Sequence, residues 1–137
     1  MLSVNIYAQA QKIEFQNYDW DVKASIHKMN ESEMKESAVV IKDVRETEYA
    51  YDNEGMLEEF YSRHRIIHIN ESGAVEEHNR IYIPVTQPDQ LLVFKARSVA
   101  KNGKVIEKTK SDMKEITEEG RTYLIIAVDG LEKDGEL

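Results

Sequence analysis

Three of the histidines are the residues whose type and spacing come nearest to a metal site. His64 and His68 lie in one short segment, and His78 follows it. Zinc holds imidazole nitrogens at ~2.1 Å, but strand residues four apart are separated by ~13 Å, since a strand rises ~3.3 Å per residue. The β-branched residues around His64 and His68 favour a strand over a helix. We therefore expect no metal site and no other cofactor.

Arginines form the main basic group in an otherwise acidic chain. Arg63 and Arg65 would project from one face of a strand, and Arg80 follows later in the sequence. The guanidinium fork suits a carboxylate or a phosphate. The ordinary alternative is cross-strand pairing with glutamates such as Glu46 or Glu48. We favour pairing within a sheet, because opposite-charge cross-strand pairs are ordinary sheet chemistry, and keep the three arginines as candidate contacts for a ligand or partner.

Tyrosines could extend such a contact surface, and Tyr61 and Tyr82 join the arginines as candidate contact residues. Exposed tyrosine rings could form an aromatic platform for a sugar. Tyrosine also fits a half-buried pleated surface, so an inward-facing core position is the alternative. The tyrosines concerned are Tyr49, Tyr51, Tyr61, Tyr82 and Tyr123.

Paired carboxylates are the remaining candidates for catalysis. They occur at Glu58–Glu59, Glu76–Glu77 and Glu118–Glu119. A glycosidase needs two carboxyl groups across a cleft, whereas adjacent residues of a strand point to opposite faces. No Ser-His-Asp order and no glycine-rich phosphate loop stand out. We expect no catalytic residues, and a carboxylate-based hydrolase is the weakest of the functions considered.

Composition limits the class of protein. The 137 residues correspond to one domain, and the net charge of −8 argues against a nucleic-acid partner. The absence of cysteine excludes disulfides, thiolate metal sites and a cysteine nucleophile. No apolar run approaches the ~18 residues of a membrane-spanning helix, so no membrane insertion is expected.

The elements that must position these side chains are mostly strands. A short helix is expected near residues 31–36, because Asn30 can cap it and Glu33 can complete a capping box. Apolar, β-branched runs separated by turn residues then predict an antiparallel β-sandwich or barrel. The expected strands are residues 38–41, 45–51, 56–69, 81–83, 91–100, 104–110 and 123–128.

Two turns carry the clearest local signals. Asp52 to Gly55 has glycine at its fourth position, and Asn102-Gly103 is a strong hairpin signal. A two-residue loop at Asn102-Gly103 would place Arg97 opposite Lys108, an unfavourable pair of like charges. The sequence therefore indicates a bulge in that hairpin. Asn70 to Gly73 is expected to be a further turn, and Pro84 is expected to stop the strand at residues 81–83.

The first ten residues differ from the rest. Ala8-x-Ala10 after the apolar residues 2–7 fits the small-x-small pattern of a signal-peptidase site. Residues 1–10 are therefore interpreted as a signal-peptide remnant or a disordered end, with an ordinary first strand as the alternative. Residues 11–137 would form a single β-sandwich domain, exported to the periplasm or the cell surface.

Five motifs occur in a characteristic order along residues Ser37–Leu137: Ala38–Ile41, Tyr49–Asp52, Arg63–Gly73, Ile81–Pro84 and Ala96–Lys104. With these motifs the segment resembles a domain family of unknown function that precedes transglutaminase-like, papain-fold domains in large exported bacterial proteins. The resemblance implies an immunoglobulin-like β-sandwich with an accessory role and no catalytic residues.

The end of the chain departs from that family. The family continues into further strands where Gly135-Glu136-Leu137 stands here, so the domain is expected to be truncated. A strand left unpaired there, near the apolar run 123–128, would favour a homodimer through this edge.

The first hypothesis is therefore a non-catalytic accessory module that positions a neighbouring domain or binds a protein partner. The alternative is a stand-alone glycan- or peptide-binding domain.

Overall fold

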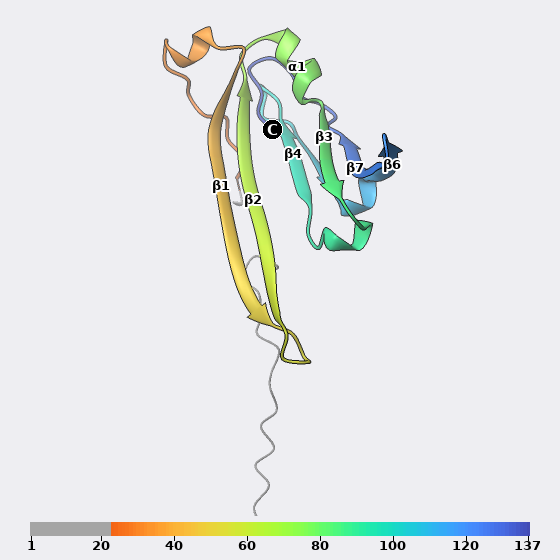
Figure 1. The fold of residues 1–137 in the computed structure, drawn as a ribbon. Coiled ribbons are helices and arrows are strands. Elements are labelled where there is room, and N and C mark those ends of the chain that lie inside the picture. Colours follow the sequence, from red (N-terminus) through yellow and green to blue (C-terminus); the bar gives the residue numbers. More distant parts are fainter. Residues whose placement is uncertain (1–22) are drawn as a thin grey trace, which may run out of the picture. The chain divides into compact units, whose positions relative to one another are not determined.

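The computed structural model describes residues 23–137 and shows a mainly β chain with antiparallel strands (Figure 1). This confirms the predicted mainly β, antiparallel class; the finer assignment to an immunoglobulin-like sandwich stays a prediction. The helical segments of the described residues are too short to cross a membrane. The elements in order are η2 (Glu33–Lys35), β1 (Ala38–Tyr51), β2 (Leu57–Ile69), α1 (Ser72–His78), β3 (Arg80–Val85), η3 (Pro88–Gln90), β4 (Lys95–Val99), β5 (Val105–Thr109), η4 (Lys110–Asp112), β6 (Lys114–Glu118) and β7 (Arg121–Ala127).

The chain divides into two compact units. The described part of the first is Val44–His64, and that of the second is residues 23–43 and Arg65–Leu137. Strands β1 and β2 pair with each other and contribute to both units. A single domain over residues 11–137 stays a prediction, and the interpretation of residues 1–10 lies outside the described residues.

In the first unit, the predicted turn after Tyr51 is confirmed. The Asp52 N–H donates to the Met56 carbonyl (2.9 Å), and the Gly55 N–H donates to the Asp52 carbonyl (3.1 Å). Gly55 has a φ of 81°, a conformation that glycine adopts without steric cost. The Asp52 side chain accepts hydrogen bonds from the N–H groups of Glu54 and Met56. This local bonding fixes where β1 ends and β2 begins.

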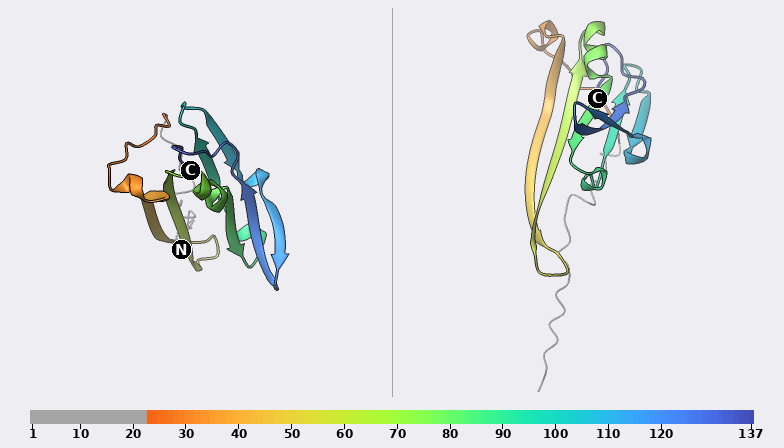
Figure 2. Two further views of the ribbon diagram at one scale, coloured as in Figure 1. Left: turned by 90° about the horizontal axis from the view of Figure 1, so that it is seen from above. Right: turned by 45° about the vertical axis from the view of Figure 1, so that its right-hand side comes forward.

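In the second unit, β7 is the middle strand of a three-stranded sheet in the order β3-β7-β6 (green, dark blue and light blue in Figure 2). Strand β6 was not predicted; it joins β7 through a two-residue turn in which Glu119 and Gly120 have positive φ. Pro84 does not stop β3 but lies within it, opposite Tyr123. An edge strand tolerates proline, because its missing N–H can lie on the unpaired side.

The hairpin of β4 and β5 contains the predicted bulge. Arg97 lies opposite Glu107, and Lys108 lies opposite Ala96. The Ala100 N–H donates to the Lys104 carbonyl, which makes the loop one residue longer than Asn102-Gly103 alone. The additional residue replaces a like-charge pair with an opposite-charge pair, which is favourable across a sheet.

Two helical segments differ from expectation. The capping box near residues 31–36 forms, since Asn30 Oδ1 accepts from the Glu33 N–H (3.0 Å) and Glu33 Oε2 accepts from the Asn30 N–H (2.8 Å). It begins only the 3₁₀ turn η2, because the β-branched strand β1 follows at once.

Asn70–Gly73 was expected to be a turn, but the chain enters α1 at Ser72. Helix α1 buries Ala74 in a core formed with Ile67, Ile69, Val128 and Leu131.

Candidate functional site

The last residues of the second unit pair on both sides. Leu137 exchanges two backbone hydrogen bonds with Ile67 at the end of β2 (2.8 and 2.9 Å), and Glu136 exchanges two with Val99 at the end of β4 (2.8 and 2.9 Å). These bonds seat the C-terminal residues between β2 and β4. The Glu136 side chain is thereby carried into the interior, where it is only 4% exposed.

This pairing corrects the expected edge. The strand residues beside the C-terminal segment have partners, and β7, which contains most of the run 123–128, is bonded to β3 and β6. Neither segment is therefore the unpaired edge that the sequence suggested. Self-association through the C-terminal region stays a prediction, which light scattering over a concentration series would test.

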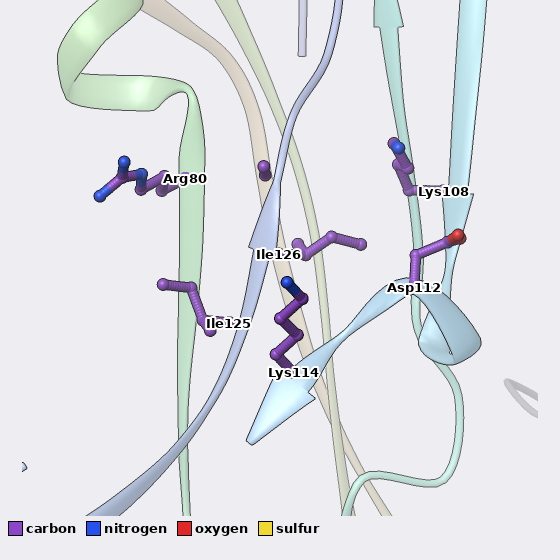
Figure 3. Close-up of a pocket in the computed structure, with 7 residues that line it drawn as sticks. Arg80, Lys108, Asp112, Lys114, Ile125 and Ile126 are labelled. Atoms are coloured by element: carbon purple, nitrogen blue, oxygen red, sulfur yellow. The ribbon is translucent and has the colours of Figure 1, made fainter. Parts of the chain in front are cut away.

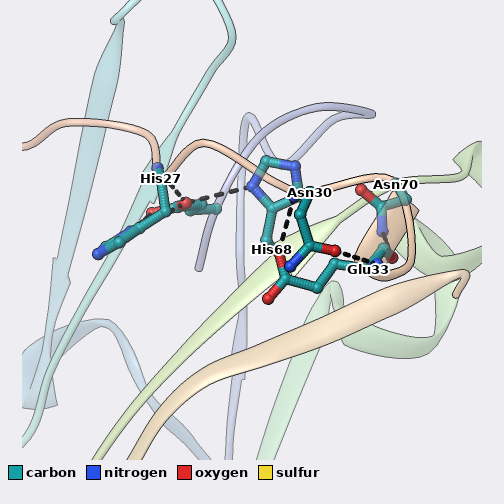
Figure 4. A network of polar contacts seen from close by, with 6 residues as sticks. His27, Asn30, Glu33, His68 and Asn70 are labelled. Carbon is teal, nitrogen blue, oxygen red and sulfur yellow. Dashed lines mark hydrogen bonds and ion pairs between the residues drawn. The ribbon is translucent and has the colours of Figure 1, made fainter. Parts of the chain in front are cut away.

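The carboxylate of Glu136 is held by His27 and His68, both of which are labelled in Figure 4. His68 Nδ1 lies 3.2 Å from Glu136 Oε1, and His27 Nδ1 lies 3.0 Å from Glu136 Oε2. The His27 main-chain N–H also donates to Glu136 Oε1 (2.7 Å). His68 is buried, whereas the side chain of His27 is about half exposed. We call these three residues the His–Glu cluster; its contacts compensate a carboxylate that would be costly to bury alone.

A second polar group anchors the neighbouring turn. Asn70 Nδ2 donates to the carbonyls of Glu33 (2.9 Å) and Glu36 (2.8 Å), which satisfies the backbone of η2 (Figure 4). In return, the Ser37 carbonyl accepts from the Asn70 N–H (2.9 Å). Asn70 therefore connects the residues before β1 to the end of β2. The turn η2, most of whose side chains are exposed, is held through hydrogen bonds to its main-chain carbonyls.

The chemistry of the His–Glu cluster is limited by its surroundings. A histidine paired with a carboxylate can act as a general base when the imidazole reaches a substrate. Here the His68 ring and the Glu136 carboxylate are both buried, and only the His27 ring, whose Nδ1 contacts that carboxylate, is half exposed. The described residues also contain no group of three potential ligands arranged to hold a metal ion. We interpret the His–Glu cluster as a set of structural contacts that hold the C-terminal segment in place.

Sequence reasoning did not find this cluster. Glu136 lies 109 residues from His27 and 68 residues from His68 in the chain. His68 was considered only as a zinc ligand, and no spacing or motif relates it to the other two residues. Only the pairing of the C-terminal segment with β2 and β4 brings them together.

The structure places the predicted contact residues on two strands. Tyr61, Arg63 and Arg65 occupy exposed positions of β2, and Arg63 has further interactions of its own. Arg80 and Tyr82 occupy exposed positions of β3. In both strands these exposed residues alternate with half-buried ones, as expected for a strand that has one face more buried than the other.

The inward-facing alternative is wrong for four of the five tyrosines. Tyr49, Tyr51, Tyr61 and Tyr82 are exposed, and only Tyr123 is half-buried. The six glutamates of the adjacent carboxylate pairs are also exposed. The rings of these four tyrosines are thus accessible to a ligand or partner. The glutamates of the carboxylate pairs lie at exposed surface positions.

Arg80 also lines a pocket beside β7, together with Lys108, Asp112 and Lys114 (Figure 3). The guanidinium of Arg80 points away from the two lysines in that view. Lys108 Nζ is bound to Asp129 (2.6 Å), and this hydrogen bond raises the pKa of Lys108. The cations of the pocket therefore do not converge on one point where an anion could sit.

Comparison of the chain with models of protein families, with curated proteins and with solved structures finds no match. The likeness of residues 37–137 to the transglutaminase-associated family therefore remains an expectation from the sequence.

A zinc titration tests the metal prediction. We expect no stoichiometric binding of zinc by His64, His68 and His78, because His68 is buried and its Nδ1 contacts Glu136. Isothermal calorimetry of the protein and of His68→Ala should give the same weak background. A submicromolar site that is present in the protein and lost in the variant would contradict this prediction.

A surface ion pair next to the His–Glu cluster predicts a pH effect. Lys101 Nζ lies 2.7 Å from Asp134 Oδ2, and the hydrogen bond from this ammonium lowers the pKa of Asp134. Since the folded-state pKa is the lower one, the stabilisation is present above the ordinary pKa of an aspartate and is lost as pH falls through the folded value. We expect Lys101→Met to raise the pKa of Asp134 toward its ordinary value, as followed by carboxyl-carbon NMR.

Lys133→Met is the matched control for this titration. Lys133 lowers the pKa of Asp134 through its charge but less than Lys101, which also donates the hydrogen bond. Its removal should raise the pKa of Asp134 by less than the removal of Lys101. Equal increases in the two variants would show that the hydrogen bond contributes nothing.

Proposed function

We propose that this chain is a non-catalytic accessory module of an exported bacterial protein and that it acts through contacts with a neighbouring domain or a protein partner. The observation that carries this proposal is the surface of residues 44–64. Half of the exposed large hydrophobic side chains of the described residues belong to this one segment: Val44, Tyr49, Tyr51, Met56, Leu57 and Tyr61. A concentration of exposed apolar side chains is typical of an interaction site.

The immunoglobulin-like sandwich and the association with a transglutaminase-like domain are further parts of this proposal. They are supported by the order of motifs from Ala38 to Lys104 and by the antiparallel strands. The backbone of Leu137 is hydrogen-bonded to Ile67. A domain that followed Leu137 would therefore start from a residue whose backbone is held in place, which suits a positioning role.

The coding DNA beyond Leu137 tests the association. We expect the reading frame to continue into a papain-fold domain that contains a cysteine and a histidine. A stop codon directly after Leu137, or an unrelated domain, would contradict the transglutaminase association.

A stand-alone glycan- or peptide-binding domain is the second candidate. The exposed rings of Tyr49, Tyr51, Tyr61 and Tyr82 favour it, since aromatic side chains are common contacts for both kinds of ligand. A soluble β-glucan or chitin oligosaccharide should then bind, and Tyr61→Ser should weaken the binding. The accessory module is preferred because the apolar exposure extends beyond the tyrosines to Met56 and Leu57.

A further inference from the structure

The β1–β2 hairpin combines its apolar surface with a concentration of negative charge. Residues 46–62 contain six carboxylates and no lysine, arginine or histidine, in a chain whose total net charge is −8. One eighth of the chain therefore carries a local charge of −6. The carboxylates are those of Glu46, Glu48, Asp52, Glu54, Glu58 and Glu59.

The turn determines which side chains share a face. The hydrogen bond from the Asp52 N–H to the Met56 carbonyl sets these two residues opposite each other. Because side chains alternate along a strand, odd-numbered residues of β1 and β2 near the turn then lie on one face. We call this the tyrosine face; its apolar members, each more than half exposed, are Tyr49, Tyr51, Leu57 and Tyr61.

The exposure of the two strands agrees with this assignment. Tyr49 and Tyr51 are exposed, while Ala50 between them is buried. In β2, Tyr61 is exposed, while its neighbours Phe60 and Ser62 are half-buried. The carboxylate of Glu59 lies at an exposed position of the same face. Aromatic rings and a carboxylate are thus presented together toward the turn, and Arg45 and Arg63 lie on the same face farther from it.

This combination selects a cation. A lysine or arginine side chain is attracted to the face of a tyrosine ring, and the surrounding carboxylates raise the local concentration of positively charged partners. A neutral glycan would use the rings but gain nothing from the carboxylates, and a second copy of this acidic hairpin would be repelled. The charge therefore favours a basic partner over both of these.

We propose that the tyrosine face binds a basic segment of a partner protein, with lysine or arginine side chains against the rings and Glu59 and with the other carboxylates of residues 46–62 attracting the segment at longer range. This rests on the proposed function in that the hairpin is taken as the interaction surface. Asp52 takes no direct part, because its side chain accepts hydrogen bonds from the N–H groups of Glu54 and Met56.

The test uses a synthetic probe, a fluorescent ten-residue peptide of alternating lysine and threonine. We expect fluorescence anisotropy to show binding in 50 mM salt, with an affinity that falls about tenfold in 300 mM salt because of screening. The same peptide with glutamate for lysine should not bind. The triple variant Glu54→Gln, Glu58→Gln, Glu59→Gln should bind the lysine peptide about tenfold more weakly.

Two matched controls separate this surface from the general acidity of the protein. Glu115→Gln, Glu118→Gln, Glu119→Gln removes the same charge from β6 and its turn, and its affinity should change less than about twofold. The pair Tyr49→Ser, Tyr61→Ser should weaken binding about fivefold, whereas Tyr82→Ser on β3 should not. Circular dichroism melts of every variant establish that it is folded.

Several outcomes would overturn the proposal. Absence of binding, or an equal loss in the two glutamine triples, would show that the hairpin is not a cation site. Binding of a chitin or β-glucan oligosaccharide instead, lost in the double serine variant, would identify a glycan site. A concentration-dependent dimer that the same variant dissolves would make a second copy the occupant. None of these results bears on the reading frame after Leu137, so the two proposals fail separately.

Discussion

Glu136→Ala is expected to lower the free energy of unfolding by about 3 kcal/mol, because removal of the buried carboxylate leaves the His68 ring and the His27 main-chain N–H without this partner. The carboxylate is almost fully buried and accepts the His27 main-chain N–H in addition to its contacts with two imidazoles. Urea denaturation measures the change, and the melting temperature should fall by about 10 °C in a chain of this size.

Two comparisons make this prediction specific. Glu136→Gln keeps the size of the side chain and one acceptor oxygen, so it should cost less, about 1–2 kcal/mol. Glu115→Ala removes an exposed carboxylate of β6 and should change stability by less than about 0.5 kcal/mol. Equal stability of Glu136→Ala and Glu115→Ala would mean that the His–Glu cluster contributes nothing to folding.

Gly135→Ala is expected to destabilise the protein by about 2 kcal/mol through overpacking. A Cβ atom on Gly135 would lie 2.9 Å from the carbonyl oxygens of both Glu132 and Val99. These are backbone atoms, and Val99 belongs to the pairing that holds Glu136, so neither can move aside cheaply. Urea denaturation should show a lower midpoint, and amide exchange should be faster at Val99 than in the unaltered protein.

Gly73→Ala is the control for this substitution. Gly73 lies in helix α1, and a Cβ atom there would meet nothing within 4 Å. Alanine in a helix restricts the unfolded chain and should stabilise the protein by about 0.5 kcal/mol. If the two alanine variants changed stability in the same direction, the close packing at Gly135 would not be the cause.

The sequence alone was sufficient for features that depend on neighbouring residues. The turn at Asp52–Gly55 and the capping box of Asn30 and Glu33 formed as expected, because each is made by side chains and backbone within a few residues. The bulge between β4 and β5 could also be predicted, since the simpler loop would have placed Arg97 opposite Lys108. Local conformation and adjacent charge were enough in these cases.

Helix α1 and strand β6 were not predicted, because their local sequence signals are weak. Asn70–Gly73 was expected to be a turn and the helix Ser72–His78 was not predicted, since its glycine and polar residues leave only Ala74 and Val75 to indicate a buried face. The helix forms because Ala74 joins a core with residues that lie far along the chain, Val128 and Leu131. Strand β6 has one half-buried residue, Ile116, so its alternation is too faint to identify. Its pairing with β7 provides what its own sequence does not.

The sequence by itself thus determined the class of the fold, most strand positions and the negative, tyrosine-rich character of residues 46–62. Only the tertiary structure decided that the C-terminal residues pair with β2 and β4 and that Glu136 meets His27 and His68. The physical reason is the range of the interactions. Turns, caps and alternation are governed by residues close in the chain, whereas the partners of a buried carboxylate are selected by which distant strands come to lie side by side.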